Sequence, residues 1–244
     1  QSAKTYMIDV LKKFKNELEA ATGKRITDDD LRMSIGTFNK IRENLSEIYE
    51  LQSLQPGIIK GADLYTLVKG SMIMDKNEAA SYLSVIACAL KKIKAPENPG
   101  KRIIISGSIC DSPDIYTAIE EAGGVVVGDD LCTGQRWFDG RIEQKDTDPI
   151  NAIADRLMTR VICPAKHSDP VTRGNNIVSL AKKNRADGVI FMLLKFCDPH
   201  AFDYPYLKDF LENNGIKTIL IEIDDQQQSA GQLSTRLETF IHMI

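Results

Sequence analysis

The sequence lacks the features that mark nucleic-acid binding, membrane insertion or secretion. Its 244 residues carry a formal net charge of −3, without the basic excess that nucleic-acid-binding domains need. No apolar run approaches the roughly 20 residues that cross a bilayer, and the chain does not open with a secretory signal pattern. Five cysteines, an odd number at low density, indicate a reducing compartment. We therefore expect a cytoplasmic protein that binds neither nucleic acid nor a membrane.

The common nucleotide and metal signatures are also missing. There is no GxGxxG, no GxxxxGK[ST] and no CxxC pair, which argues against a dinucleotide fingerprint, a P-loop and a zinc ribbon. Histidine occurs three times. A Cys–His nucleophile would depend on His200, three residues after Cys197, and no third group is identified to orient it. That chemistry is the less favoured alternative.

The first part of the chain is predicted to be helical. Apolar residues recur at helical spacing over 6–21, 31–48, 62–74 and 75–90. Thr27 with Asp30 resembles a capping box for the second of these helices. The run 95–100, rich in proline and glycine, is the clearest break in the chain. We predict a helical linker or bundle over residues 1–95.

Beyond the break, strands alternate with helices. Short runs of β-branched and other apolar residues predict strands at 103–106, 125–128, 188–194 and 218–223. Helices are expected near 113–122, 149–158, 174–185, 204–214 and 230–243, with Ser229 and Gln232 capping the last. The fold class is therefore α/β: a helical N-terminal region, then a Rossmann-like parallel sheet of about four strands flanked by helices, over 101–244.

Three cysteines follow predicted strands by a few residues: Cys110, Cys132 and Cys197. In an open α/β sheet, ligands bind beyond the carboxyl ends of the strands. Thiolates there suit zinc, copper(I) or an iron–sulfur cluster. Equally, a free cysteine can be a small buried hydrophobe, and spacing alone does not decide between the two.

Other residues near these strand ends have a simpler interpretation. Asp129-Asp130 and Asp224-Asp225 could act as acid/base groups or hold Mg²⁺, but turn formation and helix capping are favoured for aspartate. Trp137 lies close to Cys132 in the sequence and is either a lid over the crevice or ordinary packing.

Several segments together resemble one family, the 2-hydroxyacyl-CoA dehydratase / benzoyl-CoA reductase superfamily, in the C-terminal portion of its 2-hydroxyglutaryl-CoA dehydratase D-component-like chains. The segments that carry the resemblance are 187–190, 195–199, 204–208, 128–134, 163–166 with Arg173, 221–224 and 231–240. The helical part, including 27–32, is similar to the linker region that precedes this domain. Each piece is weak alone, and the combination is specific.

The resemblance implies a cofactor and its ligands. Such subunits hold an iron–sulfur cluster, usually 4Fe–4S, between two Rossmann-like domains, and Cys197 is the best candidate ligand, with Cys132 second. Cys163 and Cys110 rank lower, and Cys88, inside a helix, is expected in the core. No catalytic residue is assigned.

The resemblance also implies a reaction and partners. An ATP-dependent iron–sulfur activator would deliver a low-potential electron to an acyl-CoA thioester bound at the cluster, and a homologous second subunit would complete a dimer. The motifs lean slightly to the benzoyl-CoA reductase branch over the 2-hydroxyacyl-CoA dehydratase branch. Alternatives are a double-cubane-cluster reductase and a non-catalytic Rossmann-like scaffold subunit.

The start of the chain departs from the family pattern. Family chains carry another α/β domain with further cysteine ligands before the helical region, whereas this sequence begins at Gln1 within the linker. We therefore expect a fragment that cannot complete the cluster and is inactive by itself.

Overall fold

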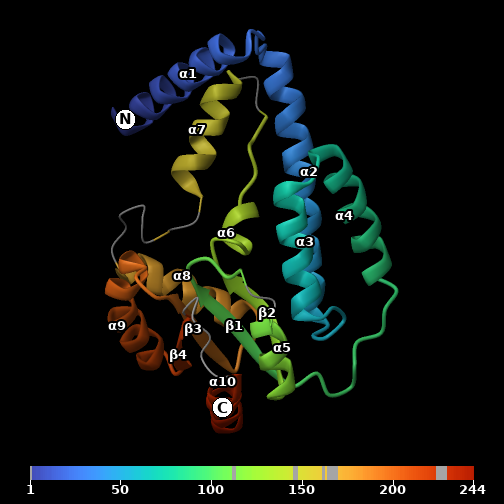
Figure 1. Cartoon of the computed structure of the whole chain (residues 1–244), viewed down its shortest axis with the longest axis vertical. Coiled ribbons are helices and arrows are strands. Elements are labelled where there is room, and N and C mark those ends of the chain that lie inside the picture. The colour runs from blue at the N-terminus through green and yellow to red at the C-terminus, as the bar shows by residue number, and fades with distance from the viewer. Residues whose placement is uncertain (1, 112–113, 145–147, 161–162, 164–169, 224–229) are drawn as a thin grey trace.

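The described part of the helical region contains two long and two shorter helices, which Figure 1 shows at the N-terminal end of the chain. The computed structural model describes residues 2–111, 114–144, 148–160, 163, 170–223 and 230–244. The four helices are α1 (Ser2–Thr22), α2 (Asp28–Leu54), α3 (Gly61–Ile73) and α4 (Lys76–Leu90). No helix in these ranges is apolar over enough of its length to span a membrane.

Local capping and one apolar cluster explain these helices. The Thr27 side chain accepts from the Asp30 N–H and the Asp30 carboxylate accepts from the Thr27 N–H, so the predicted capping box of α2 is confirmed. The buried faces of α2, α3 and α4 then pack together through side chains such as Ile41, Val68 and Leu83. Up to the end of α4, the described residues of the first predicted unit thus form helices joined by short loops.

The second part holds a four-stranded, all-parallel sheet, as predicted. Its strands are β1 (Lys101–Gly107), β2 (Gly124–Asp130), β3 (Gly188–Leu194) and β4 (Lys217–Ile223), in the spatial order β2-β1-β3-β4. The strand β2 pairs with one side of β1, and β3, the next strand in the chain, pairs with the other side of β1. The carboxyl ends of β1 and β3 therefore form the topological switch point at which such sheets bind ligands.

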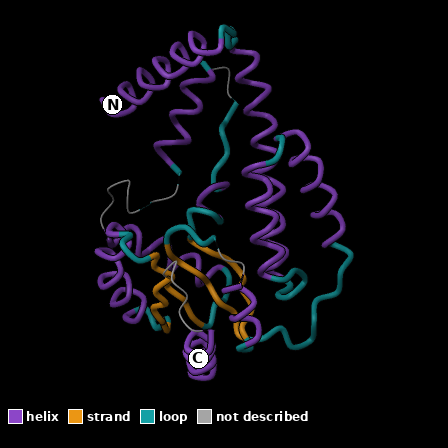
Figure 2. The backbone as a smooth tube through the Cα atoms, viewed as in Figure 1, coloured by secondary structure: helices purple, strands orange, loops and turns teal. Residues whose placement is uncertain are grey.

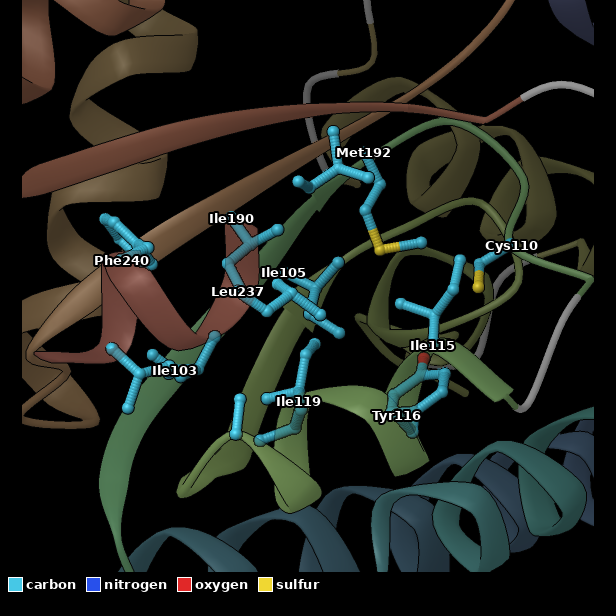
Figure 3. Packing of buried hydrophobic residues seen from close by; sticks show 14 of the residues in the cluster. Ile103, Ile105, Cys110, Ile115, Tyr116, Ile119, Ile190, Met192, Leu237 and Phe240 are labelled. Carbon is cyan, nitrogen blue, oxygen red and sulfur yellow. The ribbon is translucent and has the colours of Figure 1, made fainter. Parts of the chain in front are cut away.

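Helices cover both faces of the sheet (Figure 2). The helices α5 (Asp114–Glu121) and α10 (Ala230–Met243) pack on one face, where Ile103, Ile119 and Phe240 share a cluster (Figure 3). On the other face, α8 (Pro170–Lys183) and α9 (Asp198–Asn213) pack against residues such as Ile104. Successive strand residues point to opposite faces, so a strand covered on both sides, such as β3, is apolar along its whole length, as the sequence indicated.

Among the described residues between β2 and α8 lie α6 (Gln135–Phe138) and α7 (Pro149–Thr159). The predicted start of α9 near Tyr204 was wrong, since that helix begins at Asp198. Pro199 lies in its first turn, where a missing N–H costs no hydrogen bond, and Pro205 is inside the helix. Ser229, the predicted cap of α10, lies outside the described residues.

Candidate functional site

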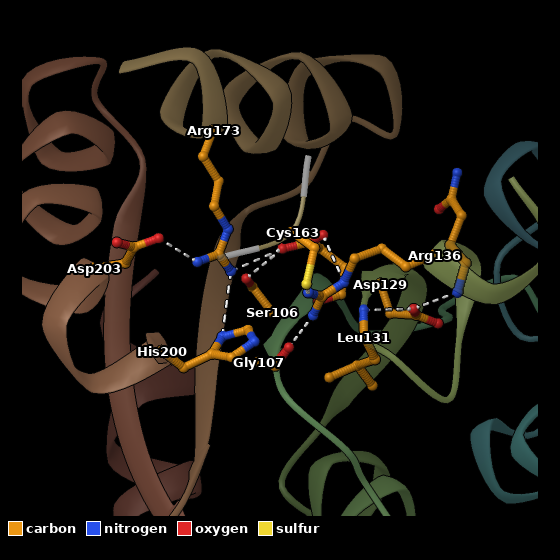
Figure 4. A network of polar contacts seen from close by, with 11 residues as sticks. Ser106, Gly107, Asp129, Leu131, Arg136, Cys163, Arg173, His200 and Asp203 are labelled. Atoms are coloured by element: carbon orange, nitrogen blue, oxygen red, sulfur yellow. Dashed lines mark hydrogen bonds and ion pairs between the residues drawn. The ribbon is translucent and has the colours of Figure 1, made fainter. Parts of the chain in front are cut away.

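A buried polar network lies at the carboxyl ends of β1 and β2 (Figure 4). At its centre is Asp130, the last residue of β2, which is 3% exposed. Its Oδ2 accepts a 2.9 Å hydrogen bond from Ser106 Oγ on β1. Its carboxylate also lies 3.1 Å from Arg136 Nε and 3.4 Å from Arg173 Nη2. Two guanidinium groups thus neutralise one buried carboxylate, which offsets the cost of its desolvation.

Arg136 comes from α6 and fixes this short helix to the sheet. Its Nη2 donates to the Gly107 carbonyl and, at 2.5 Å, to the Asp130 carbonyl. Its Nη1 donates to Cys163 Sγ at 3.8 Å. One side chain therefore connects the ends of β1 and β2 to a cysteine from the segment before α8.

Arg173 comes from α8 and connects the network to α9. Its Nη1 donates to Asp203 Oδ2 at 2.9 Å, and its Nη2 lies 3.3 Å from His200 Nδ1. Because a guanidinium only donates, His200 Nδ1 has to accept and the imidazole is neutral. Burial, reinforced by the charges of Arg173 and Arg136, lowers the pKa of His200 to about 3. His200 is therefore held as an acceptor.

Asp129 shapes the loop that carries Cys132. Its Oδ1 accepts from the backbone N–H groups of Leu131 (3.1 Å) and Gln135 (2.8 Å), and its Oδ2 accepts from Tyr49 Oη at 2.6 Å. Burial raises the pKa of Asp129, and these hydrogen bonds oppose that rise. A Cβ at Gly134 would overlap the Asp129 carboxylate, so the loop requires glycine there. The expected turn-forming role of this aspartate is confirmed.

The structure brings Cys132 together with Cys163. The Cys132 N–H donates to the Ser108 carbonyl at 2.9 Å, which anchors the loop beside β1. A hydrogen bond between the two thiols, together with partial burial, raises the pKa of the Cys132 thiol well above its ordinary value. At neutral pH Cys132 is therefore a thiol, and a metal ion would have to displace its proton.

Cys197 lies where the sequence placed it, beyond the carboxyl end of β3. It is the N-cap residue of α9, its side chain makes no cap hydrogen bond, and it is partly exposed. The preceding residue, Phe196, has φ of 69° and an 88% exposed side chain. This turn places Cys197, partly exposed, just beyond the carboxyl end of β3, where the Lys195 N–H donates to the Ile223 carbonyl at the end of β4.

The remaining cysteines have different surroundings. Cys110 is buried in the cluster with Ile115 and Tyr116, as the packing interpretation requires. Cys88 was expected in the core and is exposed, because α4 turns Ala87 and Leu83 inward and Cys88 falls on the opposite side. Asp224 and Asp225 lie outside the described residues.

A metal-binding set is not assembled within the described ranges. In them, no three or more cysteine, histidine, aspartate or glutamate side chains converge to hold a metal ion. These residues therefore do not fit a complete cluster site. A cluster bound to Cys197 would need ligands in addition to those that the described residues bring together.

A cavity of about 200 Å³ adjoins the network. Its lining includes Asp130 and Arg136 from the network and Asn176, Ser179 and Lys183 from α8. The cavity gives a polar ligand access to the flank of α6. Sequence reasoning missed the roles of Arg136 and His200 in the network, because the contacts of Arg136 with Gly107 and Cys163 and of His200 with Arg173 form only in the fold.

Comparison with known proteins finds relatives along the whole chain. The family described as "2-hydroxyglutaryl-CoA dehydratase, D-component" matches residues 1–244. The chain is 33% identical over 224 residues to the (R)-phenyllactyl-CoA dehydratase beta subunit of Clostridium sporogenes, covering 92% of this chain and 59% of that protein. It is 27% identical over 242 residues to one of the subunits of benzoyl-CoA reductase from Thauera aromatica, covering 98% and 63%.

A third relative is the (R)-2-hydroxyglutaryl-CoA dehydratase subunit beta of Acidaminococcus fermentans, at 26% identity over 242 residues. That match covers 98% of this chain and 64% of the relative. The chain thus spans less than two thirds of the length of each of these relatives.

Proposed function

Because this chain belongs to the 2-hydroxyglutaryl-CoA dehydratase D-component family, we propose that it forms part of one subunit of an enzyme that dehydrates or reduces a CoA thioester. In that enzyme Cys197 is one thiolate ligand of an iron–sulfur cluster, with Cys132 as a second candidate. The single observation that carries the proposal is the placement of Cys197, a partly exposed residue, just beyond the carboxyl end of β3, one of the two strands that form the switch point.

The chain's own residues would prepare this edge of the sheet. Arg136 and Arg173 fix the ends of β1 and β2 and the start of α9 relative to one another. Neutral His200 sits three residues after Cys197 within α9, so Arg173 helps to position the helix that bears the thiol. A bound cluster would supply low-potential one-electron chemistry.

The names of the relatives support a multi-subunit assembly. Each of the three is named as a single subunit of its enzyme, and we propose that a homologous second subunit completes the enzyme here. An ATP-dependent iron–sulfur activator is the proposed electron donor. Both partners belong to the proposal for the full-length protein.

The test is the iron and acid-labile sulfide content of the anaerobically purified full-length protein. We expect a 4Fe–4S-type content in the wild type, which falls in Cys197→Ser and is retained in Cys88→Ser. Cys88 is the matched control because it is exposed on α4. A folded Cys197→Ser variant with a full complement of iron would contradict the ligand assignment.

The substrate class is tested separately. With the activator and a reductant present, turnover of 2-hydroxyacyl-CoA thioesters indicates a dehydratase, and turnover of benzoyl-CoA indicates a reductase. A protein that holds no iron and turns over neither thioester would instead be a scaffold subunit.

A further inference from the structure

Three guanidinium groups converge on a second, smaller cavity between α2, α6 and α7. The cavity measures about 110 Å³ and is lined by two aromatic and three basic side chains: Phe38, Arg42, Trp137, Arg156 and Arg160. Residues four apart lie on the same side of a helix, so Phe38 and Arg42 share one side of α2. Figure 1 shows α6, which bears Trp137, beside α2 and below α7.

The three positive charges lie close enough to act on one another. Burial, followed by the charges of Arg156 and Arg160, lowers the pKa of Arg42 to about 10. The pKa of Arg156 is lowered in the same way by burial and by Arg160, and Asp139 opposes that effect. Like charges close together in a partly buried site repel each other, so this arrangement favours an anion.

The protein's own contacts hold Arg156 and Arg42 in place. Arg156 donates to the backbone carbonyls of Gly140 and Asp139, both at 2.8 Å, and to that of Trp137 at 3.3 Å. The Arg42 guanidinium lies over the Phe38 ring, with Cζ 5.5 Å from the ring centroid. Its Nη1 donates to Asn39 Oδ1 at 3.0 Å. A guanidinium has five N–H donors, and this leaves Arg42 with donors for a ligand.

We propose that this cavity is a binding site for a phosphate group, held by Arg42 and Arg160 within the positive field of Arg156 and bordered by the Trp137 ring. Guanidinium groups match the geometry of phosphate oxygens, and a cavity of about 110 Å³ has room for one tetrahedral anion. The phosphate comes either from inorganic phosphate or from the 3′-phosphate of coenzyme A. The second source rests on the proposed function, and the first does not.

The experiment is isothermal titration calorimetry of the full-length protein with inorganic phosphate at low salt. We expect saturable binding that Arg42→Gln and Arg160→Gln each weaken by about tenfold or more, as loss of a charge-assisted hydrogen bond predicts. The matched control is Arg141→Gln, at an exposed arginine that pairs with Glu43. It removes the same charge nearby and is expected to change the affinity by less than about twofold.

Coenzyme A and dephospho-coenzyme A distinguish the two sources. The site takes the 3′-phosphate if two results are found together. The wild type binds coenzyme A more tightly than dephospho-coenzyme A, and Arg42→Gln binds the two with equal affinity. Equal binding of the two in the wild type, with retained arginine-dependent binding of inorganic phosphate, assigns the site to free phosphate.

Two results would overturn the proposal. One is that neither inorganic phosphate nor coenzyme A shows saturable binding. The other is that Arg141→Gln loses as much affinity as Arg42→Gln and Arg160→Gln. Arg160→Gln, at the end of α7, keeps the test valid if Arg42→Gln does not fold. Iron content measured on the same variants is expected to be unchanged, so failure here is distinguishable from failure of the cluster assignment.

Discussion

The Tyr49 hydroxyl on α2 donates a 2.6 Å hydrogen bond to Asp129 Oδ2 at the end of β2. Both side chains are buried, at 7% and 1% exposure. Gln52, one turn further along α2, donates to the Val126 carbonyl of the same strand at 2.9 Å. The helical region is therefore joined to the edge of the sheet through buried polar contacts, and the loop bearing Cys132 depends on α2.

Replacing Tyr49 with Phe removes that hydroxyl and leaves Asp129 with its two backbone donors. We expect the free energy of unfolding to fall by about 1–3 kcal/mol, the usual cost of an unmet buried polar group. Urea denaturation measures the change. Tyr82→Phe, at an exposed site on α4, is the control, and an equal loss there would refute the assigned role of Tyr49.

The neutral state of His200 makes stability depend on pH. The folded pKa is lowered to about 3, whereas an unfolded histidine titrates near 6.5. Between these values the unfolded chain binds the additional proton. The free energy of unfolding should therefore fall as pH drops from about 6.5 towards 3, by at most about 1.4 kcal/mol per pH unit from this group.

Denaturation series at several pH values test this expectation. His200→Asn should flatten the dependence in that window, and His242→Asn, at an exposed position on α10, is the matched control. Identical slopes in the wild type and His200→Asn would show that the imidazole titrates alike in both states.

Gly134→Ala places a methyl group against the Asp129 carboxylate, where no space exists for it. The loop must shift, and we expect a loss of stability of about 1–3 kcal/mol, in the range of overpacked sites. Gly36→Ala serves as the control, because nothing lies within 4 Å of its added Cβ within α2. That change should stabilise by about 0.4–1 kcal/mol. Thermal unfolding of both variants checks the opposite signs.

Arg173→Met removes a buried cation from between Asp130 and Asp203. We expect a loss of about 3–5 kcal/mol, the usual result of breaking a buried ion pair from one side. Arg141→Met breaks an exposed pair with Glu43 and should cost no more than about 1 kcal/mol. Chemical denaturation separates the two, and comparable small losses would show that the network contributes little to stability.

The positions of the strands and their parallel arrangement could be predicted, because each strand is a short, mainly apolar run between helical segments. Strand β3 shows this best, with Val189 to Met192 all buried. The position of Cys197 followed from it, since a residue just beyond a strand end is placed by the strand. Its role as a cluster ligand stays a prediction.

The network could not be predicted, because its partners are brought together only by the fold. Arg173 and Asp130 are 43 residues apart in the sequence, and a buried arginine has no periodic signature. The contact between Cys132 and Cys163 has the same origin. The start of α9 was also mispredicted from the sequence. Proline favours the first turn of a helix, and both Pro199 and Pro205 could have marked it.

Trp137 follows Arg136 directly in a helix of only four residues, and the two side chains belong to different sites. Arg136 donates to Cys163 Sγ and to the Gly107 carbonyl at the end of β1. Trp137 instead lines the smaller cavity between α2, α6 and α7. Trp137 also packs against the apolar cluster of α2, α3 and α4. Because adjacent residues share one backbone, this single helical turn ties the ends of two strands to the helical region.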